Sequence, residues 1–132
     1  MAGVAGNRDL ADLLRGLRPT LLAGEFVFVS TSGPVDALPA AAMVREAEGV
    51  SYVVMRTEAH ARGLAYDFVG AWITLDVDSA LDAVGLTAAV STALADAGIS
   101  ANVIAGARHD HVVVPFDRAA DALAVLHRLS GA

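Results

Sequence analysis

The second half of the chain constrains the fold most, because its apolar residues change their period in a defined order. Residues 71–78 alternate as a strand does, so that Ile73 and Leu75 lie on the face opposite Trp72. A helical run, two short apolar runs and a second helical run follow. This order of strand, helix, strand, strand and helix lacks only one strand of a βαββαβ unit, the ferredoxin-like plan.

Both helical runs carry an apolar stripe and a residue suited to a helix end. Gly98 follows the first run, as glycine often does at a helix C-terminus, and Asp117 is expected to cap the second. Between them, apolar runs at 101–105 and 112–115 flank a polar turn and predict a hairpin. The predicted stripes are Leu86, Val90, Ala93, Leu94 and Ala97 in residues 86–97, and Ala120, Leu123, Ala124, Leu126 and His127 in residues 117–129.

The first half begins with a predicted helix and a strand. Residues 8–17 carry leucines at helical spacing after a candidate cap, Asn7. Residues 19–24 are expected to form a link. Residues 25–31 have apolar side chains on both faces, which is typical of a strand inside a sheet.

The rest of the first half predicts a second hairpin and a short helix. A loop rich in proline and glycine follows the strand at 25–31, where a βαββαβ unit would have its first helix. Apolar runs at 42–45 and 50–55 predict the hairpin, although a helix at 42–48 is the competing interpretation because alanine, methionine, arginine and glutamate favour helices. Residues 57–62 predict the short helix.

Similar order in the two halves indicates an internal duplication. Residues 53–61 and 113–121 both run from a hairpin strand into a helix. We therefore predict an α+β protein of two units with antiparallel sheets packed on helices, the first unit (1–68) abbreviated and the second at 69–132. An N-terminal strand, at 25–31 or elsewhere, is expected to complete the second unit, so that the units share a sheet.

Composition excludes several classes of function. The net charge of −6 and the pI near 4.9 disfavour nucleic acid or an anionic membrane as a partner. No cysteine is present, and all nine basic residues are arginine, so neither a thiolate nor a Schiff-base lysine is available. The N-terminus lacks the pattern of a signal peptide, and no apolar run approaches the roughly 20 residues that span a bilayer. A cytoplasmic protein is expected.

Sequence motifs for catalysis are also missing. The chain has no Gly-x-Ser-x-Gly elbow, no phosphate-binding loop of Walker type and no Gly-x-Gly-x-x-Gly after a strand. Its carboxylates show no spacing that singles out an acid–base pair. We expect no enzyme and no cofactor.

The segment 78–87 is the best candidate for a ligand site. It leads into a helix N-terminus, where free N–H groups and the helix dipole favour a carboxylate. Gly85 would allow close approach to the backbone, and Asp78 or Asp82 could hold an ammonium group. The alternative is that Gly85 only permits tight packing and Ser79 only caps the helix. The candidates are Asp78, Ser79, Asp82, Val84, Gly85, Leu86 and Thr87.

Two histidines at the tip of the second hairpin form a weaker candidate site. His109 and His111 are two residues apart and could share a strand face to bind Zn²⁺, but the sequence supplies no definite third ligand. Turn residues that satisfy backbone groups are the simpler interpretation. His60 and His127 fall in helical patterns and are expected on the surface.

Residues 83–100, 102–104 and 109–115 together resemble an ACT domain. The likeness extends from Leu13 to Leu129 and is greatest to small proteins with two ACT units of the kind found in aspartate kinase. It implies effector binding at the strand-to-helix loop and against the second strand of a neighbouring unit. That strand corresponds here to Asn102, Val103 and Ile104.

Taken together, the residues and the resemblance predict a non-catalytic regulatory protein. Its ligand is expected to be an amino acid or a similar small metabolite, and it is expected to form a homodimer because open sheet edges invite pairing. A partner enzyme is implied, since no catalytic domain is attached. The alternatives are an interaction or dimerisation module without a ligand, and a metal-binding protein based on His109 and His111.

Overall fold

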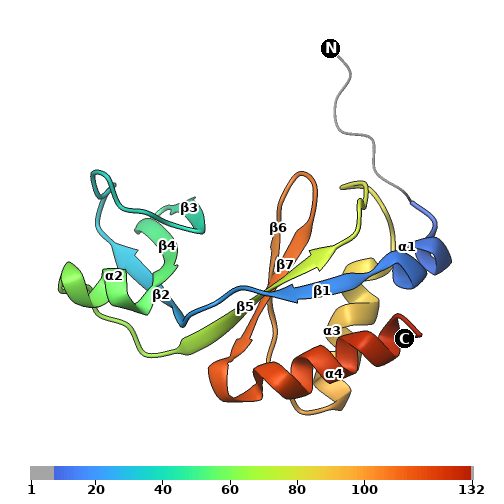
Figure 1. Cartoon of the computed structure of the whole chain (residues 1–132). Coiled ribbons are helices and arrows are strands. Elements are labelled where there is room, and N and C mark those ends of the chain that lie inside the picture. The colour runs from blue at the N-terminus through green and yellow to red at the C-terminus, as the bar shows by residue number, and fades with distance from the viewer. Residues whose placement is uncertain (1–7, 132) are drawn as a thin grey trace.

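A computed structural model describes residues 8–131, which form one antiparallel sheet of seven strands, with the helices packed against it. The sheet bends into two lobes that are joined by the long strand β5 (Figure 1). In chain order the elements are α1 (Leu10–Gly16), β1 (Arg18–Leu21), β2 (Phe26–Thr31), β3 (Ala42–Glu46), β4 (Gly49–Met55), α2 (Arg56–Ala61), β5 (Val69–Asp76), α3 (Leu86–Asp96), β6 (Asn102–Ala105), β7 (Asp110–Pro115), the 3-10 turn η1 (Phe116–Arg118) and α4 (Ala119–Leu129).

Strand β5 is shared by the two lobes. The strands follow the order β3-β4-β2-β5-β7-β6, and β1 also pairs with β5. Leu21 pairs with Ile73 and Phe26 with Gly70, so β1 and β2 lie end to end along one edge of β5. Leu21 and Phe26 are five residues apart, whereas their partners Ile73 and Gly70 on β5 are only three residues apart. The chain between β1 and β2 therefore contains two residues more than the facing segment of β5. Segments from both halves of the chain thus share one sheet.

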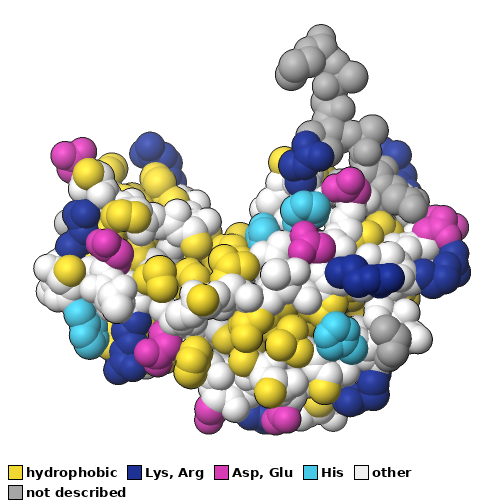
Figure 2. Space-filling model, in the orientation of Figure 1, with side chains coloured by type: hydrophobic (Ala, Val, Ile, Leu, Met, Phe, Trp, Pro, Cys, Tyr) yellow, Lys and Arg dark blue, Asp and Glu magenta, His cyan; other side chains and the backbone are white. Residues whose placement is uncertain are grey.

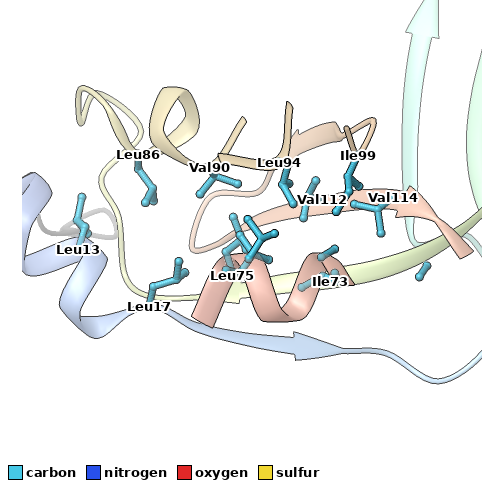
Figure 3. Close-up of a cluster of buried hydrophobic side chains, with 14 residues drawn as sticks. Leu13, Leu17, Ile73, Leu75, Leu86, Val90, Leu94, Ile99, Val112 and Val114 are labelled. Carbon is cyan, nitrogen blue, oxygen red and sulfur yellow. The ribbon is translucent and has the colours of Figure 1, made fainter. Parts of the chain in front are cut away.

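One face of the sheet carries the helices. Ile73 and Leu75 of β5 and Val112 and Val114 of β7 point to this face, where they meet α1, α3 and α4. Figure 3 shows these side chains converging with leucines of α1 and α3. Leu17, which follows α1, is completely buried in the same cluster. The N-terminal helix is therefore part of the core of the C-terminal lobe.

The other lobe has a smaller core under α2. It contains Val27, Val29, Val54 and Ala59. Val69 of β5 packs against this smaller core. Because side chains alternate along a strand, Val69 lies on the same face of the sheet as Ile73. All packed helices thus cover one face, and the opposite face carries an aromatic and aliphatic cluster around Trp72. In Figure 2 hydrophobic side chains line the hollow between the two lobes.

Most of the predicted elements are present. The strand 71–78, the helix 86–97 and both hairpins are confirmed, and no helix lies between β2 and β3 within residues 8–131. Leu86, Val90 and Leu94 are the buried residues of α3, in agreement with the predicted stripe. The competing helix at 42–48 is wrong, because these residues form β3 and pair with β4.

Three sequence interpretations need correction. The link expected at 19–24 contains β1, since Pro19 lies in a strand that has a partner on one side only. Asp117 does not cap the last helix, which the chain enters through η1 without a side-chain cap. The buried residues of α4 are Ala122, Val125 and Leu126, whereas Ala120 and Ala124 are exposed.

At the N-terminus the helix is shorter than expected. Asp9, whose side chain accepts from the Asp12 amide, is the N-cap of α1, and the proposed cap Asn7 lies outside the described residues. None of the helices within residues 8–131 is both long enough and apolar enough to cross a membrane.

The buried position of Leu17 predicts a large loss of stability on truncation. Leu17→Ala should lower the free energy of unfolding by about 2–5 kcal/mol, because it removes buried methyl groups and leaves a cavity. Urea titration followed by circular dichroism measures the change. Val84→Ala is the matched control, since the Val84 side chain is 84% exposed. Equal effects of the two substitutions would show that α1 and β1 do not belong to the core.

Candidate functional site

The loop between β5 and α3 places Gly85 at the start of the helix. Gly85 is the N-cap residue with φ of 109°, a conformation that favours glycine. No side chain caps α3, so its first N–H groups lack the partner that a Ser, Thr, Asn or Asp cap would supply. A Cβ atom at Gly85 would lie 3.0 Å from Cδ2 of Leu10. Gly85 therefore serves tight packing against α1 as well as the turn.

A small cavity of about 100 Å³ lies between this loop and the second hairpin. Two hydroxyl side chains, Ser79 and Thr87, and one carboxyl side chain, Asp110, contribute its polar groups. The combination of an uncapped helix start with hydroxyls favours a carboxylate, and a carboxylate side chain can hold an ammonium group. The lining residues are Ser79, Ala80, Leu81, Ala83, Leu86, Thr87, Ala105 and Asp110.

Asp110 differs from an ordinary surface carboxylate. Burial raises its pKa above the usual value, while the neighbouring His111 opposes the rise. The charged form is therefore poorly solvated, and a ligand ammonium group at this position would favour it. Asp110 was not among the predicted ligand residues, because its proximity to Thr87 depends on how the hairpin docks beside α3.

The two aspartates predicted to hold an ammonium group lie elsewhere. Asp82 forms an exposed ion pair with Arg8, at 2.8 Å between Nε and Oδ1, and the hydrogen bond from Arg8 lowers the Asp82 pKa. Asp78 is exposed and lies 4.0 Å from Nδ1 of His109. Neither aspartate lines the small cavity, and Val84, which is 84% exposed, and Gly85 do not line it either. Ser79, Leu86 and Thr87 are the predicted residues that the cavity brings together.

The predicted residues of the second strand lie along β6, an outer strand of the sheet. Asn102 pairs with Val113 and donates from Nδ2 to its carbonyl at 3.4 Å, and Ile104 pairs with His111. Asn102, Val103 and Ile104 do not line the cavity within the same chain. Their part in binding was expected against a neighbouring unit, and it stays a prediction.

The two histidines of the hairpin have different surroundings. His109 lies with Nδ1 3.2 Å from the Val77 carbonyl oxygen. His111 lies with Nδ1 3.0 Å from the Thr74 hydroxyl, and its ring is 5.0 Å from that of Trp72. Among the described residues, no three histidine, aspartate or glutamate side chains are arranged to hold a metal ion.

Comparison with protein families identifies both halves of the chain. One ACT-domain model matches residues 5–71, and a second ACT-domain model matches residues 68–128. The chain belongs to the ACT-domain family. It contains two ACT units in tandem, and its folded order of strands and helices agrees with the ferredoxin-like plan of that family. A comparison with curated proteins finds no match.

Solved structures extend the likeness of this ACT protein over nearly its whole length. A Vibrio cholerae protein of unknown function, described as a possible transport protein, is 42% identical, with a TM-score of 0.83 over 92% of this chain and 95% of its own. An Agrobacterium tumefaciens protein is 19% identical, with a TM-score of 0.67 over 86% and 89%. The ligand-free regulatory subunit of Thermus thermophilus aspartate kinase is 11% identical, with a TM-score of 0.63 over 84% and 95%.

These findings support a regulatory, ligand-binding role for the tandem ACT protein. At 11% and 19% identity, the Thermus and Agrobacterium structures show a shared fold.

The environment of His111 predicts a pH dependence of stability. Burial lowers its pKa from the ordinary value of 6.5, and nearby His109 lowers it further. The unfolded chain therefore binds a proton to this residue more readily than the folded chain does. The contribution of neutral His111 to the free energy of unfolding is therefore fully present above pH 6.5, and it is lost as the pH falls through the pKa of His111 in the folded protein.

His111→Gln removes this dependence. The free energy of unfolding of the native protein minus that of the variant should decrease as the pH falls from about 7 to about 5. Urea titration at each pH measures it. The exposed His127→Gln variant is the control for the loss of a histidine side chain. A constant difference for His111→Gln would contradict the assigned shift.

Proposed function

We propose that this ACT protein binds a small amino acid, or a metabolite with the same two charged groups, without catalysing a reaction. The observation that carries the proposal is the small cavity in which Ser79, Thr87 and Asp110 meet beside the uncapped start of α3. The ligand carboxylate lies against the hydroxyls and the helix start, and the ammonium group lies against Asp110. Binding of this kind needs no nucleophile and no cofactor.

The size of the cavity restricts the ligand. A volume of about 100 Å³ is well below the roughly 300–1,000 Å³ that is usual for sites of drug-sized molecules. A bulky side chain would have to extend outward over the exposed loop residues Leu81 and Val84, or against β6 of a second chain. The latter arrangement would give Asn102 its expected part in binding.

The protein is proposed to act in trans and as a homodimer. A ligand signal would pass to a separate partner enzyme in the cytoplasm. Strand β3 ends the sheet, and Met43 and Val44 on it are 44% and 55% exposed. Such an open apolar edge favours pairing with a second copy. An ACT module that only dimerises is the second candidate, favoured by the same edge.

Ligand binding is tested first by thermal shift against the twenty amino acids. A ligand at one hundred times its dissociation constant adds about 2.7 kcal/mol to stability, which gives a visible rise in Tm. Thr87→Val and Asp110→Asn should each abolish the rise, because they remove a hydroxyl and the ammonium partner. Substitution of Gly85 is a poor test, since an added Cβ would displace Leu10.

Asp121→Asn is the control for loss of a carboxylate, because Asp121 is exposed on α4 and pairs with Arg118. It should keep the full rise in Tm. A rise that survives both Thr87→Val and Asp110→Asn would reject the small cavity as the site. The absence of a rise with any amino acid would favour the module that only dimerises.

The dimer is tested by Val44→Glu, which places a charge on the open edge of β3. The variant should shift the molar mass in light scattering from that of a dimer to that of a monomer, since burial of an unpaired charge is costly. Val84→Glu, at a valine that is 84% exposed and distant in the chain, should remain a dimer. A native protein that is monomeric at all concentrations would contradict the proposal.

A further inference from the structure

A larger hollow, of about 600 Å³, lies where the two units meet. This volume falls in the range of roughly 300–1,000 Å³ that is usual for sites of small molecules. Glu25 comes from the junction of β1 and β2, Arg56 and His60 come from α2, and Phe116 follows β7. The lining residues are Gly24, Glu25, Met55, Arg56, Thr57, His60 and Phe116.

The hollow contains one charge of each sign. Arg56 donates from Nη1 to Oε2 of Glu25 at 3.2 Å, and the two side chains are 39% and 37% exposed. Such half-exposed pairs contribute little to stability because solvent screens them. Their opposite charges on the wall of a hollow match the two charges of a zwitterion.

Tyr66 helps to hold the guanidinium group of Arg56 in place. Its hydroxyl accepts a hydrogen bond from Nε of Arg56 at 2.6 Å and lies 2.5 Å from Nε2 of His60. The Arg56 carbon Cζ also lies 5.6 Å from the centre of the tyrosine ring. Nη2 of Arg56 has no hydrogen-bond partner within the part of the chain that the structure describes. A fixed guanidinium with a spare donor edge is suited to a carboxylate.

Two large apolar side chains are exposed at the same hollow. Met55 is 40% exposed and Phe116 is 45% exposed. Gly24 allows Met55 to lie over the turn, since a Cβ at this position would be 2.4 Å from the methionine Cε. The hollow thus offers an apolar surface beside the charged pair, which is the composition of a pocket for an amphipathic small molecule.

We propose that this hollow is a second ligand site, for a zwitterionic α-amino acid with an apolar side chain. Its carboxylate binds the free edge of Arg56, its ammonium group binds Glu25, and its side chain packs between Met55 and Phe116. The site is separate from the small cavity at Thr87 and does not rest on it. Because residues from both ACT units line it, its ligand contacts both lobes.

The experiment is isothermal titration of the full chain with L-methionine and with L-phenylalanine. Arg56→Met and Glu25→Gln should each weaken binding at least about tenfold, as loss of a hydrogen bond to a charged group implies. Arg45→Met is the matched control, because Arg45 is an exposed arginine on β3 that does not line the hollow. N-acetyl-L-methionine and L-methioninamide, which each lack one charge, should bind at least tenfold more weakly than L-methionine.

Thr87→Val separates this site from the small cavity. Amino-acid binding that persists in Thr87→Val but is lost in Glu25→Gln supports the second site, whether or not the small cavity also binds a ligand. Phe116→Ala, which removes apolar contact from an exposed residue, tests the same site if Arg56→Met fails to fold. Undetectable binding of both amino acids at millimolar concentration would overturn the proposal, and so would equal loss of binding in Arg45→Met.

Discussion

The pairing of β5 on both edges is the constraint on which the rest of the structure depends. One edge bonds to β7, and the other edge bonds to β1 and β2 in succession. Two strands can share one edge only if the chain between them leaves and rejoins the sheet, and the two extra residues there make this possible. Gly24, with φ of 102°, provides a conformation that other residues rarely adopt. The first lobe is attached to the second through this junction.

Alternation along β5 then determines what each face of the sheet can do. Ile73 and Leu75 point towards α3 and α4, so the apolar face of those helices is buried there. Trp72 points to the opposite face, where His111 lies against its ring. The two candidate sites lie at opposite ends of the same strand: the loop that leads to Thr87 follows Asp76, and the larger hollow includes Phe116, next to the Pro115 partner of Gly70.

Periodicity in the sequence predicted what depends on local order, and it failed where packing decides. Residues 71–78 and 86–97 repeat their apolar positions over enough residues to indicate both element and face. Helix α4 has alanine or leucine at most positions, so several stripes are equally apolar, and the docking of the helix beside α3 selects Ala122 and Val125. Strand β1 was not predicted because it contains Pro19, and proline is tolerated in a strand only where one edge is free.

Local sequence patterns also predicted only part of the candidate sites. Ser79, Leu86 and Thr87 were predictable because they adjoin a helix N-terminus in the sequence, whereas Asp110 enters the cavity from a hairpin. Glu25, Arg56 and Phe116 come from three segments, and no local pattern links them. The small cavity is lined by residues between 79 and 110 alone, so a ligand there acts on the other lobe only indirectly, through β5 or through β1 and its junction with β2. A ligand in the larger hollow contacts both units beside the Gly24 junction, where the sheet is least regular, and it would therefore bias the arrangement of the lobes directly.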